Sequence, residues 1–435
     1  MKLSNYISFS FDFLTKKKKQ LIMLTIIMSL GISLMILVLT LLASTRKGRT
    51  TCDETLTYGN SNTGYFSVQH EKGKMAPTYI EMLENEGFKT GFIIRFNGGC
   101  PTPLKELQKI QSKLEYYVKE NKSTGNYGVL DYVEMSPKLW DAFDIELAKG
   151  SKPEEVIPED EAYVYVGKNI NVELGTEYIW ENDIVKNEMG DSVKDENGEY
   201  VRRTLKYIVM GQIEEGSSVI NPNISKGDID YISDTTINLD NMVLIVANNP
   251  IGGTVYNRFF YSDNPEEFNQ KFQKMKTDNS FENGIGCETV KHIFDNMDEK
   301  NKEVINYILR LTILIMLSVI IIQSCSKIAD IIINVKEYGI YFANGFTKIN
   351  IYVIMLLETL WRFIICSSIA IVMIFSLAKF VIFENYLYEY TMNLIYSDVL
   401  VKALAMAAAV LLMAQMIPMI FISRIDVATL TKANE

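Results

Sequence analysis

The chain has 435 residues, of which 48% are hydrophobic, and it carries 43 Lys and Arg against 53 Asp and Glu. A chain with this acidic balance is not expected to bind nucleic acid, because binding to the phosphate backbone requires basic surfaces. The hydrophobic residues are gathered into a few long runs, which argues against an ordinary soluble domain and predicts a membrane protein.

The first predicted elements are a cytoplasmic segment over residues 1–20 and a transmembrane helix over 21–44. Residues 21–43 contain no charged side chain, and at ~1.5 Å per residue such a helix crosses a hydrocarbon core of ~30 Å. A cleavable signal peptide is the alternative. Its apolar part usually has only ~7–15 residues, and the sequence after residue 43 offers no small-x-small cleavage site, so we expect the helix to be retained.

Residues 45–303 are predicted to form a large mixed α/β domain outside the cytoplasm. Residues 46–303 hold 29 Lys and Arg against 44 Asp and Glu, which fits a soluble acidic surface. Runs rich in β-branched and aromatic residues predict strands, and runs with apolar residues three and four apart predict helices. The strands are expected at 91–96, 162–166, 205–211 and 242–247, and the helices at 79–86, 103–120 and 265–276.

Two further features of this domain are expected from local sequence. The polar stretch from Asp183 to Arg203 contains Asp-Glu-Asn-Gly at 195–198, which favours a tight turn and predicts a protruding β-hairpin. Residues 297–307 contain no Gly or Pro and predict a helix that runs into the second span.

Three more transmembrane helices are predicted over 304–326, 349–383 and 400–422. In the second, Arg310 lies near the start, where its side chain reaches the headgroups. In the fourth, Ala403 and Ala407 (like Ala405 and Ala409) are spaced for close helix packing, and Pro418 is expected to bend the helix. This gives a fold class of four transmembrane helices plus a mixed α/β domain between helices 1 and 2.

The third predicted span contains the charged residues Glu358 and Arg362. They stand four residues apart, on one face of a helix, and an isolated charge at that depth is costly. We therefore expect an intramembrane charged pair whose members neutralise one another. A contact with a facing span or with another subunit is the functional alternative.

The distribution of lysines predicts which side each segment faces. Five basic residues precede the first span, four of them at 16–19, against Arg46, Lys47 and Arg49 after it. Because basic residues are retained in the cytoplasm, both termini are expected there. The link 327–348 and the tail 423–435 are therefore expected to be cytoplasmic as well. The segment 384–399 is then an outer loop. The protein is expected in the cell membrane, as a multi-pass protein whose large domain is extracellular.

The sequence predicts no catalytic chemistry of its own. Neither a phosphate-binding Gly-x-x-x-x-Gly-Lys-Ser/Thr loop nor a Gly-x-Ser-x-Gly elbow occurs, so any ATPase activity is expected on a separate chain. His70 and His292 are the only histidines, and no Cys or His pair has metal-ligand spacing, so we expect no metal site and no cofactor. The outer domain holds Cys52, Cys100 and Cys287, an odd number that leaves any disulfide open.

Residues 336–347 begin with Lys-Glu, carry small residues at 339, 343 and 345, and end with Thr347. This pattern resembles the signature that follows the second span of FtsX/MacB-type ABC transporter permeases. Phe342 and Asn344 differ from the signature, where a basic and an apolar residue are usual. The stretches 143–150, 164–167 and 174–175 resemble the MacB-like periplasmic core, and 425–430 resembles the family's terminal motif without its proline. The residues in register with the signature are Lys336, Glu337, Gly339, Ala343, Gly345 and Thr347.

The resemblance implies a permease subunit that works with a separate ABC ATPase subunit, on which ATP and Mg are expected. It also implies a dimer with a second permease protomer, identical or homologous, held in membrane lipid. ATP-driven closure would be carried mechanically from the coupling segment at 336–347 to the outer domain, for export of a peptide, antibiotic or lipid-linked substrate. The alternatives are a transmembrane regulator of an outer partner such as a cell-wall hydrolase, as in FtsX, and, for 336–347 alone, a plain amphipathic loop.

Overall fold

The computed structural model consists of two compact units, which we call the helical unit (residues 1–44 and 302–435) and the sheet unit (residues 45–301). Each unit is described by itself. The described residues are 6–8, 10–11, 18–68, 76–96, 102–114, 117–118, 130–222, 235–253, 255, 257–278, 285–381 and 385–424.

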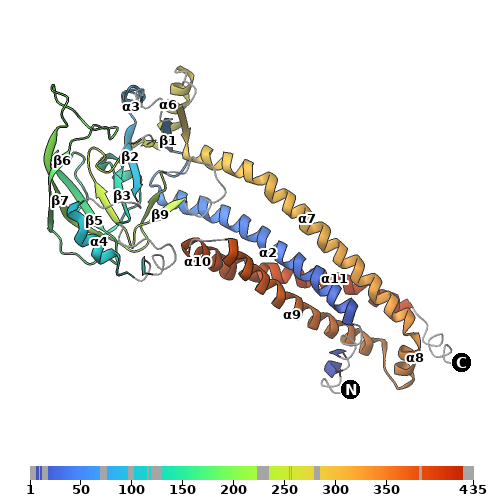
Figure 1. Ribbon diagram of the computed structural model, residues 1–435. Helices are drawn as coiled ribbons and strands as arrows, with labels where there is room; N and C mark the ends of the chain where they lie inside the picture. The colour runs from blue at the N-terminus through green and yellow to red at the C-terminus, as the bar shows by residue number, and fades with distance from the viewer. Residues whose placement is uncertain are drawn as a thin grey trace. The chain divides into compact units, whose positions relative to one another are not determined.

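Helices account for the helical unit and for short segments of the sheet unit (Figure 1). They are α2 (Lys18–Thr55), α3 (Ala76–Asn85), α4 (Lys105–Gln111), α6 (Pro265–Asp278), α7 (Val290–Ile333), α8 (Val335–Ala343), α9 (Lys348–Val381), α10 (Asn385–Leu394) and α11 (Leu400–Arg424). Shorter turns are η2 (Thr102–Leu104), η3 (Pro137–Ala142) and the π-helical η6 (Ile395–Val399).

Four helical stretches of the described chain are long and apolar enough to cross a membrane. They are Ile22–Thr55, Lys302–Ile333, Lys348–Val381 and Thr391–Arg424. The expectation of four apolar helices of spanning length is therefore confirmed, and the protein is membrane-embedded. The second helix ends at Ile333 rather than at residue 326, and Ile331, one turn after Lys327, continues its buried face.

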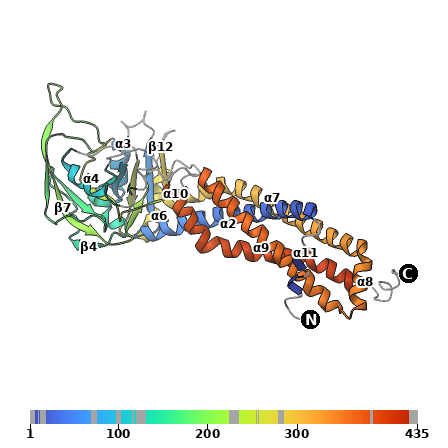
Figure 2. The same ribbon diagram turned by 60° about the horizontal axis from the view of Figure 1, so that its bottom comes forward.

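Small side chains let the helices of the helical unit approach one another closely, and Figure 2 shows α2, α7, α9 and α11 running along one another. A Cβ atom added at Gly31 of α2 would lie 3.2 Å from Ile315 of α7. The Ser29 hydroxyl of α2 donates to the Cys366 carbonyl of α9 at 3.2 Å. On α11, Ala403 and Ala407 are buried while Ala405 and Ala409 are exposed, so one of the two alanine pairs packs as expected.

The sheet unit is built on a ten-stranded mixed sheet. Its strand order is β12-β1-β11-β2-β3-β10-β5-β7-β4, with β6 paired to β7, and β8 and β9 form a separate two-stranded sheet. Neighbours are antiparallel except β10 with β3 and β5 with β7. The strands are β1 (Thr63–Val68), β2 (Lys89–Phe96), β3 (Tyr132–Met135), β4 (Leu147–Gly150), β5 (Glu161–Val166), β6 (Glu177–Ile184), β7 (Arg202–Ile213), β8 (Ser218–Ile220), β9 (Thr236–Asn238), β10 (Val243–Val246), β11 (Asn257–Tyr261) and β12 (Ile285–Thr289).

The central strand β10 shows why this sheet is apolar on both faces. Its residues Val243 and Ile245 pack into one hydrophobic cluster, and Leu244 and Val246 into another. Side chains alternate between the faces of a strand, so a strand covered on both sides reads as a continuous apolar run. That run is what made this strand predictable.

The expected elements of the sheet unit agree with the structure in part. Strands β2, β5, β7 and β10 and helices α3 and α6 lie where they were predicted, and a continuous α7 includes residues 297–307. The hairpin after Asp183 is present, with paired residues Lys186 and Ser192 and then Lys194 and Tyr200. Of the helix predicted at 103–120, the described residues form the turn η2 and then α4, which ends at Gln111, and residues 115–116 and 119–120 lie outside the described chain. Cys100 and residues 425–430 lie outside the described chain.

Candidate functional site

Helix α8 and the loop after it contain the six residues of the predicted coupling segment. The helix ends in a Schellman motif, in which the Gly345 N–H donates to the Phe342 carbonyl and the Phe346 N–H to the Tyr341 carbonyl, each at 3.0 Å. Gly345 takes the left-handed conformation that this motif requires, with φ +84°. The Phe346 ring packs on the Tyr341 ring at a centroid distance of 5.3 Å, so the loop has a defined shape.

Within this segment the six residues do not share one environment. Gly339 is buried and Glu337 is half-buried, whereas the other four are exposed: Lys336, Ala343, Gly345 and Thr347. Ile340 is exposed as well. The helix therefore has one face packed on its neighbours and one face open, which is the arrangement of a helix able to receive a partner.

The packed face of α8 joins three other helices. Tyr338 forms a hydrophobic cluster with Ile331 of α7, Ile351 and Met355 of α9, and Ile422 of α11. The cluster makes α8 part of the helical bundle rather than a loose connection. Tyr338 thus connects α8 to α7, α9 and α11.

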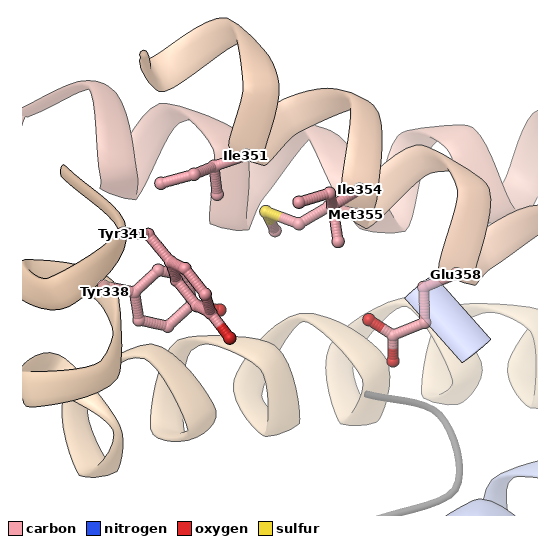
Figure 3. A pocket seen from close by; sticks show the side chains of 6 residues that line it. All are labelled: Tyr338, Tyr341, Ile351, Ile354, Met355 and Glu358. Carbon is pink, nitrogen blue, oxygen red and sulfur yellow. The ribbon is translucent and has the colours of Figure 1, made fainter. Parts of the chain in front are cut away.

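A small pocket of about 10 Å³ lies between α8 and α9. Figure 3 shows the two tyrosine rings on one side, the carboxylate of Glu358 on the other, and apolar side chains between them. The pocket connects the coupling segment to the intramembrane charged pair, two features that the sequence had left separate. Its lining consists of Tyr338, Tyr341, Ile351, Ile354, Met355 and Glu358.

The predicted charged pair, Glu358 and Arg362, is part of a cluster of three charged residues, which also includes Lys327. Glu358 accepts a hydrogen bond from Arg362 at 2.6 Å through Oε1, as expected from the spacing on α9. Its other oxygen, Oε2, accepts from the Nζ atom of Lys327 on α7. The exposed fractions of Glu358, Lys327 and Arg362 are only 2%, 5% and 6%, so two cations and one anion are buried together.

Lys327 was expected in the link after the second span. The structure places it inside α7, where its side chain connects α7 to α9. The signal that could have found it is the run of isoleucines at 331–333, which continues the apolar face of the helix by about one more turn after Lys327.

Several buried polar atoms near this cluster have no hydrogen-bond partner among the described residues. These atoms are Nε2 and Oε1 of Gln323 on α7, Nε and Nη1 of Arg362, Oγ of Ser367, and Oε1 of Gln415 on α11. Burying a polar atom without a hydrogen-bond partner inside a helical bundle lowers the stability of the folded protein. Each of these atoms would be stabilised by a hydrogen-bond partner.

The N-terminal residues also contact α9 beside the coupling loop. The Tyr6 hydroxyl donates to Oδ1 of Asn350 at 2.8 Å, and Phe11 packs edge-on against Trp361 at 6.0 Å between centroids. At the other side, Nζ of Lys348 donates to the Ser423 carbonyl at 2.9 Å. The start of α9 is thus held by elements from both ends of the chain.

The described residues contain no group of His, Cys, Asp or Glu side chains that could hold a metal ion. In comparisons with known proteins, no family model matches the chain, and a search of curated proteins found no match. The assignment of function therefore depends on the geometry of α8 and the charge cluster, together with the resemblance of residues 336–347.

Proposed function

We propose that this chain is the permease subunit of an ABC transporter, in which a separate ATPase subunit binds ATP and Mg. ATP hydrolysis on that subunit moves the permease so that a peptide, antibiotic or lipid-linked substrate is expelled at the outer face. The observation that carries the proposal is the two-sided environment of α8, which exposes the family-like residues and packs Tyr338 against α7, α9 and α11.

The exposed side of α8 has the chemistry of a docking surface for another protein. Ile340 is 50% exposed and is flanked by Lys336 and Ala343, which are also exposed. An apolar anchor bordered by charge is typical of a helix that lies in a groove on its partner. Glu337, in the first turn, is favoured there by the helix dipole and offers a carboxylate to a basic groove.

The connections of α8 support a mechanical mode of action. Asn334 alone separates α7 from α8, so a push on α8 reaches α7 directly. Helix α7 is continuous from Val290 to Ile333, and strand β12 ends at Thr289. Motion of α8 along the axis of α7 would therefore reach the sheet unit through one helix.

The proposal includes a topology and an assembly. Both termini and α8 face the cytoplasm, and the sheet unit lies outside the cell membrane, in agreement with the lysines before the first span. The working unit is a dimer with a second permease protomer, embedded in lipid.

The test is co-purification of the full-length chain with the ATPase encoded beside it, together with ATP hydrolysis by the complex in lipid. Glu337→Lys and Gly345→Val are expected to abolish association and transport while membrane insertion stays normal. Gly198→Val is the matched control for Gly345→Val, because Gly198 also has a positive φ, +83°, with nothing within 4 Å of an added Cβ. Glu196→Lys is the control for the charge reversal.

Association and transport at the wild-type level in both α8 variants would reject the coupling role of this segment. Normal association with the ATPase, combined with loss of an outer wall hydrolase activity and no transport, would favour the regulator over the transporter.

A further inference from the structure

The buried face of α7 presents two polar side chains that are one helical turn apart. Gln323 and Lys327 are both at most 5% exposed, and residues four apart lie on the same helical face. Lys327 donates to Glu358, whereas both amide atoms of Gln323 lack a partner among the described residues. On this face, Lys327 is a donor that has an acceptor, and Gln323 is a donor that has none among the described residues.

The contacts of α7 with α9 fix how the two helices run. Lys327 reaches Glu358, and Ile331, one turn further along α7, packs with Ile351 and Met355, which precede Glu358 on α9. The helices are therefore antiparallel. Gln323 lies one turn away from Lys327 in the opposite direction, at the level of the turn that follows Glu358.

A displacement of α7 by one turn would exchange the two donors. One turn is about 5.4 Å along the axis, and it would bring the amide of Gln323 to the place that Lys327 now occupies against Glu358. Arg362 would keep its bond to Glu358, because both residues belong to α9. The residues entering the vacated positions, Val319 and Gln323, are already buried on the same face.

We propose that α7 has two registers against α9, one turn apart, with Lys327 bound to Glu358 in the first and Gln323 bound to it in the second. In the second register Lys327 lies at the level that Ile331 occupies in the first, and the amide nitrogen of Gln323 donates to Glu358. The second register breaks the bond from the Ser324 hydroxyl to the Ala414 carbonyl, which is 2.8 Å long in the first register. The first register is consequently the resting one.

The register change gives the proposed function a defined movement. Because Asn334 is the only residue between α7 and α8, a shift of α7 along its axis and a displacement of α8 are one motion. One-turn slides of packed helices are an established kind of two-state transition. The use of this motion for transport rests on the proposed function, but the two registers themselves can be measured without the ATPase.

The measurement is the distance between spin labels at Ile332 on α7 and Val372 on α9, in the full chain in lipid nanodiscs. Both side chains are exposed, at 57% and 64%, and Cys100 and Cys325 are replaced by serine. Lys327→Met removes the resting contact. It is expected to populate a distance about 5 Å longer than in the parent protein, since α7 slides away from the far end of α9.

The double variant Lys327→Met with Gln323→Leu is the decisive comparison, because it removes the second contact as well. It is expected to lose the longer distance. An unchanged distance in Lys327→Met, or a longer distance that persists in the double variant, would overturn the proposal.

Gln323→Leu alone provides a second test if Lys327→Met does not fold. With Lys327 in place, loss of the unpartnered amide is expected to raise the thermal midpoint and to leave a single distance. A lower midpoint would show that Gln323 is satisfied in the resting state and would overturn the proposal. If α8 variants retain wild-type ATPase association while both registers are observed, the proposed function fails and the register exchange stands.

Discussion

Glu358 is the residue on which the charge cluster depends, because one carboxylate balances two buried cations. Removing it leaves Lys327 and Arg362 buried without an anion, which is far more costly than removing a whole group of paired charges. If the pair stood alone, loss of Arg362 together with Glu358 would leave no buried charge behind. The structure shows that Lys327 would then remain uncompensated.

We therefore predict that Glu358→Ala lowers the unfolding free energy of the full chain by about 3–5 kcal/mol. The double variant with Arg362→Ala should recover only part of this loss. The triple variant Lys327→Met, Glu358→Leu, Arg362→Met should recover most of it, since no buried charge remains. Thermal unfolding in nanodiscs measures all three, and a double variant as stable as the triple would show that Lys327 is not part of the cluster.

Glu134 is a second buried carboxylate, in the sheet unit, with a different environment. Its Oε2 accepts from the N–H groups of Ile251 and Gly252, each at 3.0 Å, and Oε1 has no partner among the described residues. Burial raises the pKa of Glu134 to about 7 from its ordinary value of 4.5, although the two backbone donors oppose the shift.

A pH dependence of stability follows from this raised pKa. Between pH 4.5 and 7 the folded protein holds a proton on Glu134 that the unfolded chain releases. The unfolding free energy therefore falls as pH rises through this window, by up to roughly 3 kcal/mol, at ~1.4 kcal/mol per pH unit. The stabilisation from the protonated carboxyl is fully present below the window and lost above it.

Glu134→Gln should remove this contribution and make the protein more stable than the parent at pH 8. The measurement is the thermal midpoint of the full chain from pH 5 to 8. Unfolding is monitored by the fluorescence of Trp140 and Trp180 in a Trp361→Phe background. Glu196→Gln, at an exposed position, is the control. An unchanged pH profile in Glu134→Gln would assign the dependence to other groups.

At the scale of elements, strand β4 requires glycine at its end for a steric reason. Gly150 has φ +96°, and an added Cβ would lie 2.1 Å from the Met210 carbonyl oxygen of β7. Gly175 has a similar φ of +81° with nothing within 4 Å of the added atom. A side chain at Gly175 would meet only the strain of a positive φ, whereas a side chain at Gly150 would meet both that strain and a steric clash. Comparing the two positions therefore distinguishes the two effects.

We predict that Gly175→Ala costs about 1 kcal/mol of stability, which is the strain of a positive φ. Gly150→Ala should cost several times more, because β4 must move away from β7 to relieve the contact. Thermal unfolding of the full chain compares them. Equal losses in the two variants would mean that β4 shifts freely and that its pairing with β7 contributes little.

For the whole molecule, the testable property is which side of the membrane the sheet unit and α8 face. We predict that a cysteine at Asp195, in the exposed hairpin, reacts with an impermeant reagent in intact cells, whereas one at Lys336 reacts only after the cells are opened. The basis is the excess of lysines before the first span. The reverse pattern would invert the topology and place α8 where no cytoplasmic ATPase can reach it.

The sequence by itself determined the features that depend on local patterns. Four apolar runs give four helices of spanning length, because a helix in lipid must satisfy its backbone internally and present apolar side chains. The apolar runs at 162–166 and 242–247 gave strands β5 and β10 for a similar reason, since both faces of these strands are buried. The strands β1, β11 and β12 were missed, because five- and six-residue runs with Gly, Ser or Asn among them have no clear periodicity.

Only the tertiary structure decided which distant residues meet. Lys327 and Glu358 are 31 positions apart, and Glu134 and Ile251 are 117 apart. Spacing along a helix predicted the bond between Glu358 and Arg362, because four residues make about one turn. No such rule relates Lys327 or Tyr338 to Glu358, since their contacts depend on how α7, α8 and α9 pack against one another. The charge cluster and the pocket beneath α8 are products of that packing.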